Sequence, residues 1–196
     1  MKERKVKLMR NTKETKINLS LNVDSFKKST ISTTLSFFDH MLLLFTYNAM
    51  FELKLTAEGN DDHHLVEDIG IVLGDAIDKV LSDRKGITRY GFSCIPMDEA
   101  LVETAIDVSG RPLLIYKVNF STPVYSKEKK FDFCLIEEFF RAFASHAKLT
   151  LHINLIYGKN NHHVAEAIFK SFGRALSAAI AYNPKLSGIP STKGVL

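Results

Sequence analysis

Along this chain the spacing of hydrophobic residues changes from a helical period to a strand period and back again, and it does so twice. Residues 37–49 and 135–147 are apolar at helical spacing. Each is followed by an alternating segment, typical of a strand with one buried face. The apolar strand positions are Phe51, Leu53 and Leu55 in the first stretch and Leu149, Leu151, Ile153 and Leu155 in the second. A glycine turn then leads to a second predicted helix with an apolar stripe. The two stripes comprise Ile69, Val72, Leu73, Ala76, Ile77 and Val80, and Ile168, Phe172, Leu176 and Ala179.

The two patterned stretches align with each other as an internal repeat when the second copy gains one residue. Phe45 then falls on Phe143 and Gly74 on Gly173. The motif His-His-x-x-Glu coincides as well, and such a set of matches indicates a duplication.

Further strands are expected ahead of each stretch, because apolar residues alternate at 17–23 in the first half and at 100–108 and 113–120 in the second. The sequence therefore predicts an α+β fold made of an internally duplicated strands-helix-strand-helix unit. We expect two sheets flanking a helical layer. The first repeat half spans residues 1–92 and the second spans 93–196, and together they form one compact domain.

Polar residues mark the ends of the second helix in each half. Asp62 and Asn161 stand just before the apolar stripes and are the predicted N-caps. Gly86 and the Asn183-Pro184 pair are the predicted stop signals.

The His-His-x-x-Glu motif suggests metal binding. Neighbouring residues of an α-helix point about 100° apart, so adjacent histidines serve two different ions more naturally than one. A glutamate three or four residues later shares a face with either histidine. A single His-His pair is more often solvent-facing or capping, but four of the seven histidines occur in these two motifs. Imidazole and carboxylate ligands suit Mn, Fe, Co, Ni or Zn rather than an all-oxygen cage.

Composition narrows the class of protein. The 196 residues are 45% hydrophobic and 24% charged, as in ordinary globular domains, and the net charge is +4. No long basic run indicates a nucleic-acid partner, and no segment approaches the roughly 20 apolar residues of a membrane helix. Cys94 and Cys134 are isolated from each other, and no apolar signal segment begins the chain. We therefore expect a cytoplasmic protein without nucleic-acid or membrane partners.

Two turns and the C-terminal tail carry groups that suit a phosphate. Arg89 and Arg111 lie at predicted turns, and Ser191 and Lys193 lie in the tail segment IPSTKG. Arginine offers forked donors, and lysine a point charge. For any one of them, an exposed side chain or a frayed tail is the commoner case. The acidic pair in PMDEAL, Asp98 and Glu99, is interpreted as a structural ion-pair element on a strand-like segment.

The motifs FFDHML, DDHHLVEDIGI, PMDEAL, DVSGRP, TLHINLIYGKNNHHVAEAIFK and IPSTKGVL occur in that order over nearly the whole chain. The chain thereby resembles the imidazoleglycerol-phosphate dehydratase family. The resemblance implies a lyase of histidine biosynthesis that converts D-erythro-imidazole glycerol phosphate to imidazole acetol phosphate and water. It further implies two Mn²⁺ ions per active site that bind the substrate as an imidazolate. Homo-oligomers are implied as well, first trimers and then a 24-mer, with metal sites between subunits.

By this resemblance each site residue has an expected role. The metal ligands are His40, His63, His64, Glu67, Glu138, His162, His163 and Glu166. The substrate and phosphate contacts are Glu14, His40, His63, His64, Glu67, Arg89, Arg111, Ser191 and Lys193. The groups closest to the chemistry are Glu14, His40, Glu67 and Glu166, with Glu14 as the acid/base.

Two departures from the family pattern and two rival functions accompany these expectations. Asn48 stands where many members carry histidine, and the loop over residues 57–62 is about three residues shorter than usual. The rivals are a binuclear metal phosphohydrolase and a metal-stabilised shell protein without catalysis.

Overall fold

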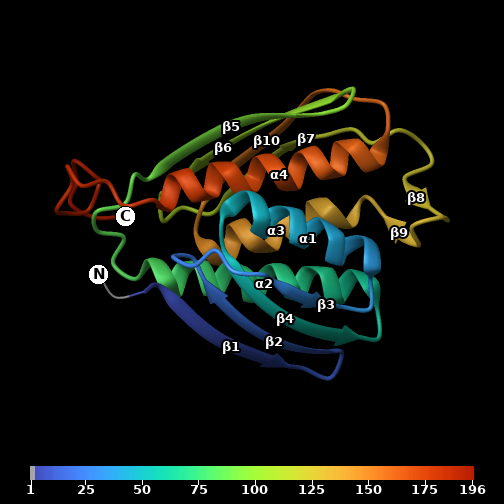
Figure 1. The fold of residues 1–196 in the computed structure, drawn as a ribbon, viewed down its shortest axis with the longest axis horizontal. Coiled ribbons are helices and arrows are strands. Elements are labelled where there is room, and N and C mark those ends of the chain that lie inside the picture. The colour runs from blue at the N-terminus through green and yellow to red at the C-terminus, as the bar shows by residue number, and fades with distance from the viewer. Residues whose placement is uncertain (1–2) are drawn as a thin grey trace.

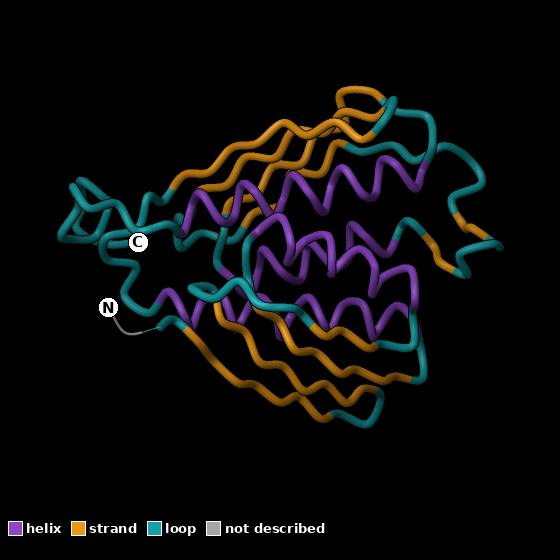
Figure 2. The backbone as a smooth tube through the Cα atoms, in the orientation of Figure 1, coloured by secondary structure: helices purple, strands orange, loops and turns teal. Residues whose placement is uncertain are grey.

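The computed structural model describes residues 3–196 and has three layers, with helices between two sheets (Figure 2). The first sheet has the strand order β1-β2-β4-β3, and the second has β5-β6-β10-β7. The helical layer holds α1–α4, and the small β8–β9 hairpin projects from one end (Figure 1). The predicted α+β fold with two sheets flanking a helical layer is confirmed.

The bounds of the elements follow the hydrophobic pattern closely. The first half holds β1 (Lys5–Asn11), β2 (Thr15–Asn22), β3 (Thr30–Ser32), α1 (Ser36–Ala49), β4 (Glu52–Gly59) and α2 (Asp62–Leu81). The second holds β5 (Tyr90–Met97), β6 (Ala100–Asp107), β7 (Leu113–Lys117), β8 (Tyr125–Ser126), β9 (Phe131–Asp132), α3 (Leu135–Ala147), β10 (Thr150–Tyr157) and α4 (Asn161–Ile180).

Several boundary predictions were wrong. The strand predicted at residues 113–120 ends at Lys117. The acidic PMDEAL segment is a hairpin rather than one strand, because Asp98 turns the backbone with φ 47° between β5 and β6. The two long helices stop at Leu81 and Ile180, several residues before the predicted signals. Ser82 already leaves the helical conformation with φ 50°.

The one residue gained by the second repeat has a visible place. In the β6–β10 pairing the register shifts between Leu155 and Tyr157, which marks a β-bulge. The equivalent β2–β4 pairing runs without a shift from Thr15↔Gly59 to Asn22↔Glu52. A bulge accommodates one extra residue in one strand, so the insertion leaves the rest of the repeat in phase.

Helices from opposite halves pack against each other: α1 against α4, and α2 against α3. A glycine lies at the centre of each contact. A Cβ on Gly173 would lie 2.5 Å from the Phe45 carbonyl oxygen, and a Cβ on Gly74 would lie 2.7 Å from that of Phe143. Only glycine allows backbones to approach this closely.

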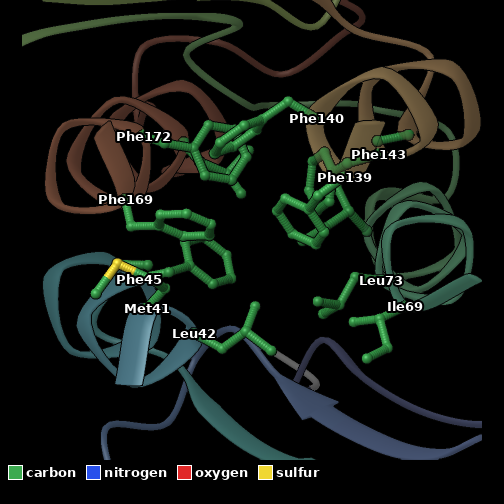
Figure 3. Packing of buried hydrophobic residues seen from close by; sticks show 14 of the residues in the cluster. Met41, Leu42, Phe45, Ile69, Leu73, Phe139, Phe140, Phe143, Phe169 and Phe172 are labelled. Carbon is green, nitrogen blue, oxygen red and sulfur yellow. The ribbon is translucent and has the colours of Figure 1, made fainter. Parts of the chain in front are cut away.

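Phenylalanine rings fill the space between the four helices (Figure 3). The Phe45 and Phe172 rings stack with centroids 5.2 Å apart, and Phe140 meets Phe172 edge to face at 4.9 Å. All three are at most 1% exposed. This aromatic core joins α1, α3 and α4, and thereby holds α4, the helix of the second His-His-x-x-Glu motif, against α1 and α3.

Candidate active site

Both His-His pairs lie at the same end of the molecule, where α2 and α4 begin (Figure 1). The helix caps are Asp61 and Asn160, one residue before the predicted Asp62 and Asn161. The Asp61 side chain accepts the His64 N–H at 3.0 Å, and the Asn160 side chain accepts the His162 N–H at 2.9 Å. The prediction was wrong because a cap must stand outside the helix to reach the N–H groups of its first turn.

The second motif gathers three candidate metal donors. His162 and Glu166 share one face of α4, and His40 approaches them from α1. The Glu166 Oε1 atom lies 2.9 Å from His162 Nε2 and 3.2 Å from His40 Nε2. All three donor atoms lie within 4.8 Å of one another, and this is the one such group that residues 3–196 contain. Two imidazoles and one carboxylate suit a transition-metal ion such as Mn²⁺ or Zn²⁺.

Glu166 is held as an anion at this cluster. Burial by itself raises the pKa of Glu166, but hydrogen bonds from Lys170 and His40 outweigh it and bring the pKa to about 2. Lys170 Nζ donates to Glu166 Oε2 at 2.6 Å, so the other oxygen is left for the histidine side of the cluster. Lys170 was missed by the sequence analysis, although its position four residues after Glu166 places both on one helix face.

His163 points to a different partner from its neighbour His162. Its Nδ1 lies 2.6 Å from Glu99 Oε2, at the turn between β5 and β6. The hydrogen bond with His163, followed by that from the Asn160 N–H, lowers the pKa of Glu99 to about 2. The same bond raises the pKa of His163. An ion pair of Glu99 was expected from the sequence, but not that its partner would be a candidate metal ligand.

The first motif is more open. His64 Nδ1 lies 3.4 Å from Glu14 Oε2 and 3.8 Å from Asp61 Oδ1. The side chains of His63 and Glu67 form no hydrogen bond or ion pair with the residues that the structure describes. The first motif therefore brings Glu14 beside His64, but it does not collect three metal donors within residues 3–196.

Glu138, the repeat equivalent of His40, lies apart from the cluster. Its carboxylate is 3.6 Å from Arg141 Nε on the same helix, α3. The structure therefore does not bring Glu138 to a second three-donor group within the described residues.

The candidate phosphate-binding residues lie together at the opposite end of the molecule. Arg89 Nε donates to Asp107 Oδ1 at 2.7 Å, and its NH1 donates to the Pro190 carbonyl at 2.9 Å, which ties down the C-terminal tail. Arg111 is largely exposed beside them, with its NH2 3.8 Å from Asp107 Oδ2. The Lys193 N–H donates to Ser191 Oγ within the tail.

The separation between the two ends follows from the length of α4. The Arg89 N–H donates to the Ala179 carbonyl in the last turn of α4, whereas His162 stands in its first turn. A helix rises 1.5 Å per residue, so these positions are about 25 Å apart. One chain therefore does not bring its phosphate-binding groups to its own metal cluster.

A family model described as imidazoleglycerol-phosphate dehydratase matches residues 33–176. The chain belongs to the imidazoleglycerol-phosphate dehydratase family. The relative from Thermodesulfovibrio yellowstonii is 51% identical over 98% of this chain and 100% of its own length. The relative from Syntrophus aciditrophicus is 47% identical over 98% of each chain.

Solved structures of the imidazoleglycerol-phosphate dehydratase family agree with the fold. The Staphylococcus aureus N315 enzyme has a TM-score of 0.83 at 42% identity, covering 91% of this chain and 99% of that one. The Pyrococcus furiosus enzyme in complex with (S)-C348 has a TM-score of 0.84 at 37% identity, covering 96% and 100%. Imidazoleglycerol-phosphate dehydratases are lyases of histidine biosynthesis, and that class of activity follows from membership.

The two positions expected to depart from the family pattern have local contacts in the structure. Asn48 donates from Nδ2 to the Leu44 carbonyl at 2.9 Å, so its side chain is engaged with its own helix. The short loop leaves two residues between β4 and α2, and its Asn60 N–H donates to the Glu14 carbonyl at 3.2 Å. Across residues 3–196, no helix combines the length and apolar character needed to cross a membrane.

Proposed function

We propose that this protein dehydrates D-erythro-imidazole glycerol phosphate to imidazole acetol phosphate and that it requires Mn²⁺. The observation that carries the proposal is the convergence of His40, His162 and Glu166 on one point, in a chain of this dehydratase family. The substrate offers ring nitrogens for metal ions, a hydroxyl to be lost and a phosphate to be gripped.

The donor chemistry fits two ions per active site. His40, His162 and Glu166 would hold one, with Lys170 neutralising the far oxygen of Glu166. The exposed His63 and His64 and the partly buried Glu67, His163 and Glu138 would complete the sites between subunits. When bound, the ions supply Lewis-acid stabilisation of negative charge on the substrate's imidazole ring.

Glu14 is the candidate acid/base group. Its carboxylate is 55% exposed and lies 3.4 Å from His64 Nδ1, so it is free to approach a substrate held at that histidine. It takes the proton from the middle carbon of the side chain, next to the carbon attached to the ring. The hydroxyl leaves the ring-attached carbon as water, and the resulting enol becomes the ketone at the middle carbon.

The substrate is too short to join both ends of one chain. With bonds of about 1.5 Å, its three-carbon chain and phosphate span less than about 10 Å. The gap between His162 and Arg89 is about 25 Å. Arg89, Arg111, Ser191 and Lys193 of one subunit would therefore serve the metal cluster of another subunit. The self-association that we propose, into trimers and then a 24-mer, would bring the two together.

The test is turnover by metal-stripped protein. Mn²⁺ and imidazole glycerol phosphate are added, and the ketone is followed by its enolate absorbance in alkali, with inorganic phosphate measured in parallel. Ketone that forms only with metal supports the proposal. Phosphate release without ketone favours a phosphohydrolase, and neither product from a metal-loaded assembly favours a structural shell.

A further inference from the structure

Two glutamates occupy equivalent places in the two halves. Glu14 directly precedes β2, and Glu99 directly precedes β6, each at the turn of an outer hairpin. The residue after each approaches an equivalent glycine, since Gly59 faces Thr15 and Gly158 faces Ala100. Glu14 and Glu99 therefore match in space, although no repeat of sequence letters reveals it.

Each of these carboxylates faces the second histidine of its own motif. Glu14 Oε2 lies 3.4 Å from His64 Nδ1, and Glu99 Oε2 lies 2.6 Å from His163 Nδ1. The duplication thus contains two carboxylate–histidine pairs, one loose and one tight.

Backbone donors account for the difference in tightness. In the first half, the Asn60 N–H donates to the main-chain carbonyl of Glu14 and leaves the carboxylate free. In the second half, the Lys159 and Asn160 N–H groups donate to Glu99 Oε1 at 3.2 and 2.7 Å. Both oxygens of Glu99 are therefore occupied, and its side chain bridges the β5–β6 turn to the start of α4.

We propose that Glu99 is a positioning residue that accepts the Nδ1–H of His163 and thereby presents Nε2 of His163 as the metal-binding nitrogen. A histidine ligand is fixed in tautomer and orientation by the acceptor on its other nitrogen. The described residues form no hydrogen bond with His163 Nε2, and Asp98 Oδ2 lies 3.7 Å from it, so this nitrogen is available. The proposal rests on the proposed function in taking His163 as a metal ligand.

The test compares Glu99→Gln with Glu103→Gln. Glu103 lies four residues further along the same hairpin, and its side chain forms no hydrogen bond or ion pair with residues 3–196. Glu103→Gln therefore removes the same negative charge as Glu99→Gln without breaking a contact. Mn²⁺ affinity and stoichiometry are measured by calorimetry on metal-stripped protein, with the melting temperature and assembly size recorded. Glu99→Gln is expected to weaken Mn²⁺ binding about 10- to 100-fold, with kcat recovering at saturating Mn²⁺. Glu103→Gln is expected to bind Mn²⁺ like the wild type.

Two further variants keep the outcome decisive. In a double-mutant cycle with His163→Ala, Glu99→Gln should cause no additional loss of Mn²⁺ affinity, because its effect passes through that ring. Glu99→Asp keeps the charge and should recover part of the affinity, even if Glu99→Gln assembles poorly. Wild-type Mn²⁺ affinity in Glu99→Gln, or equal losses with and without His163, would overturn the proposal. Calorimetry needs no turnover, so a failed dehydration assay would count against the proposed function alone.

Discussion

The motif of the second half meets His40 of the first half in a cluster of three candidate metal donors, whereas the motif of the first half leaves the equivalent groups apart. His162 and Glu166 meet His40 on one side, and His163 meets Glu99 on the other. The side chains of His63 and Glu67 form no hydrogen bond or ion pair within residues 3–196, and Glu14 Oε2 lies 3.4 Å from His64 Nδ1. The duplication therefore gives both halves the same arrangement of strands and helices. The side-chain contacts that differ between the two halves indicate which groups are fixed and which are free to react.

Replacing the free carboxylate, Glu14, with glutamine should lower kcat strongly, whereas the same replacement of the fixed carboxylate, Glu99, should not. This difference in kcat is the largest effect we expect. Glu14→Gln removes the proposed proton acceptor and should lower kcat by about 10²- to 10⁴-fold with Mn²⁺ content unchanged. Glu99→Gln, at saturating Mn²⁺, should keep most of its kcat. Steady-state kinetics with metal analysis of both variants measures this. Equal losses of kcat in the two variants would mean that the halves do not divide these roles.

The two motif glutamates should differ in their effect on stability. Glu166→Gln leaves the Lys170 ammonium without its buried partner, and breaking such a pair costs about 3 kcal/mol. Glu67→Gln removes a partly exposed carboxylate without a described partner, so its effect should stay within about 0.5 kcal/mol. Denaturant unfolding of both metal-free variants, at matched protein concentration, gives the comparison. A similar loss in both would show that Glu67 is already paired in the metal-free assembly.

The order and bounds of the strands and helices were largely predictable from sequence, because apolar periodicity is a local signal. Residues 135–147 are the helix α3 as predicted, and the one-residue insertion appears as the bulge at Leu155–Tyr157. The exchange of helix partners between halves was not predictable, since no short-range pattern specifies that α1 packs on α4. The Glu99–His163 contact was missed for the same reason, because it joins residues 64 positions apart.

The helix contacts offer a symmetric test of the duplication. Gly173→Ala and Gly74→Ala both force a methyl group against a carbonyl oxygen of the partner helix. Each should destabilise the protein by about 2 kcal/mol through overpacking. A Cβ on Gly188 would meet no atom within 4 Å, so Gly188→Ala is the matched control with little expected effect. Thermal unfolding of the three variants would contradict the symmetric frame if only one of the two helix contacts were sensitive.

The smallest effect on stability that we expect comes from the contacts of Arg4, which joins the first half to the C-terminal end of α4. Arg4 NH1 donates to the Ile180 carbonyl at 2.6 Å, while its NH2 donates to Asp24 at 2.6 Å. The hydrogen bond from Arg4 lowers the pKa of Asp24, so the folded state favours the ionised carboxylate. Its stabilisation is present above the unfolded pKa of about 4 and is lost as pH falls through the lower folded value.

Asp24→Asn should therefore destabilise the metal-free protein by about 1 kcal/mol at pH 7. The difference from wild type should shrink below about pH 4, where the wild-type carboxyl group also becomes protonated. Glu58→Gln is the control, because Glu58 forms an ion pair with Lys16 in which both side chains are largely exposed. Urea unfolding across this pH range measures the difference. A gap that stays constant below pH 4 would mean that Asp24 acts through shape rather than charge.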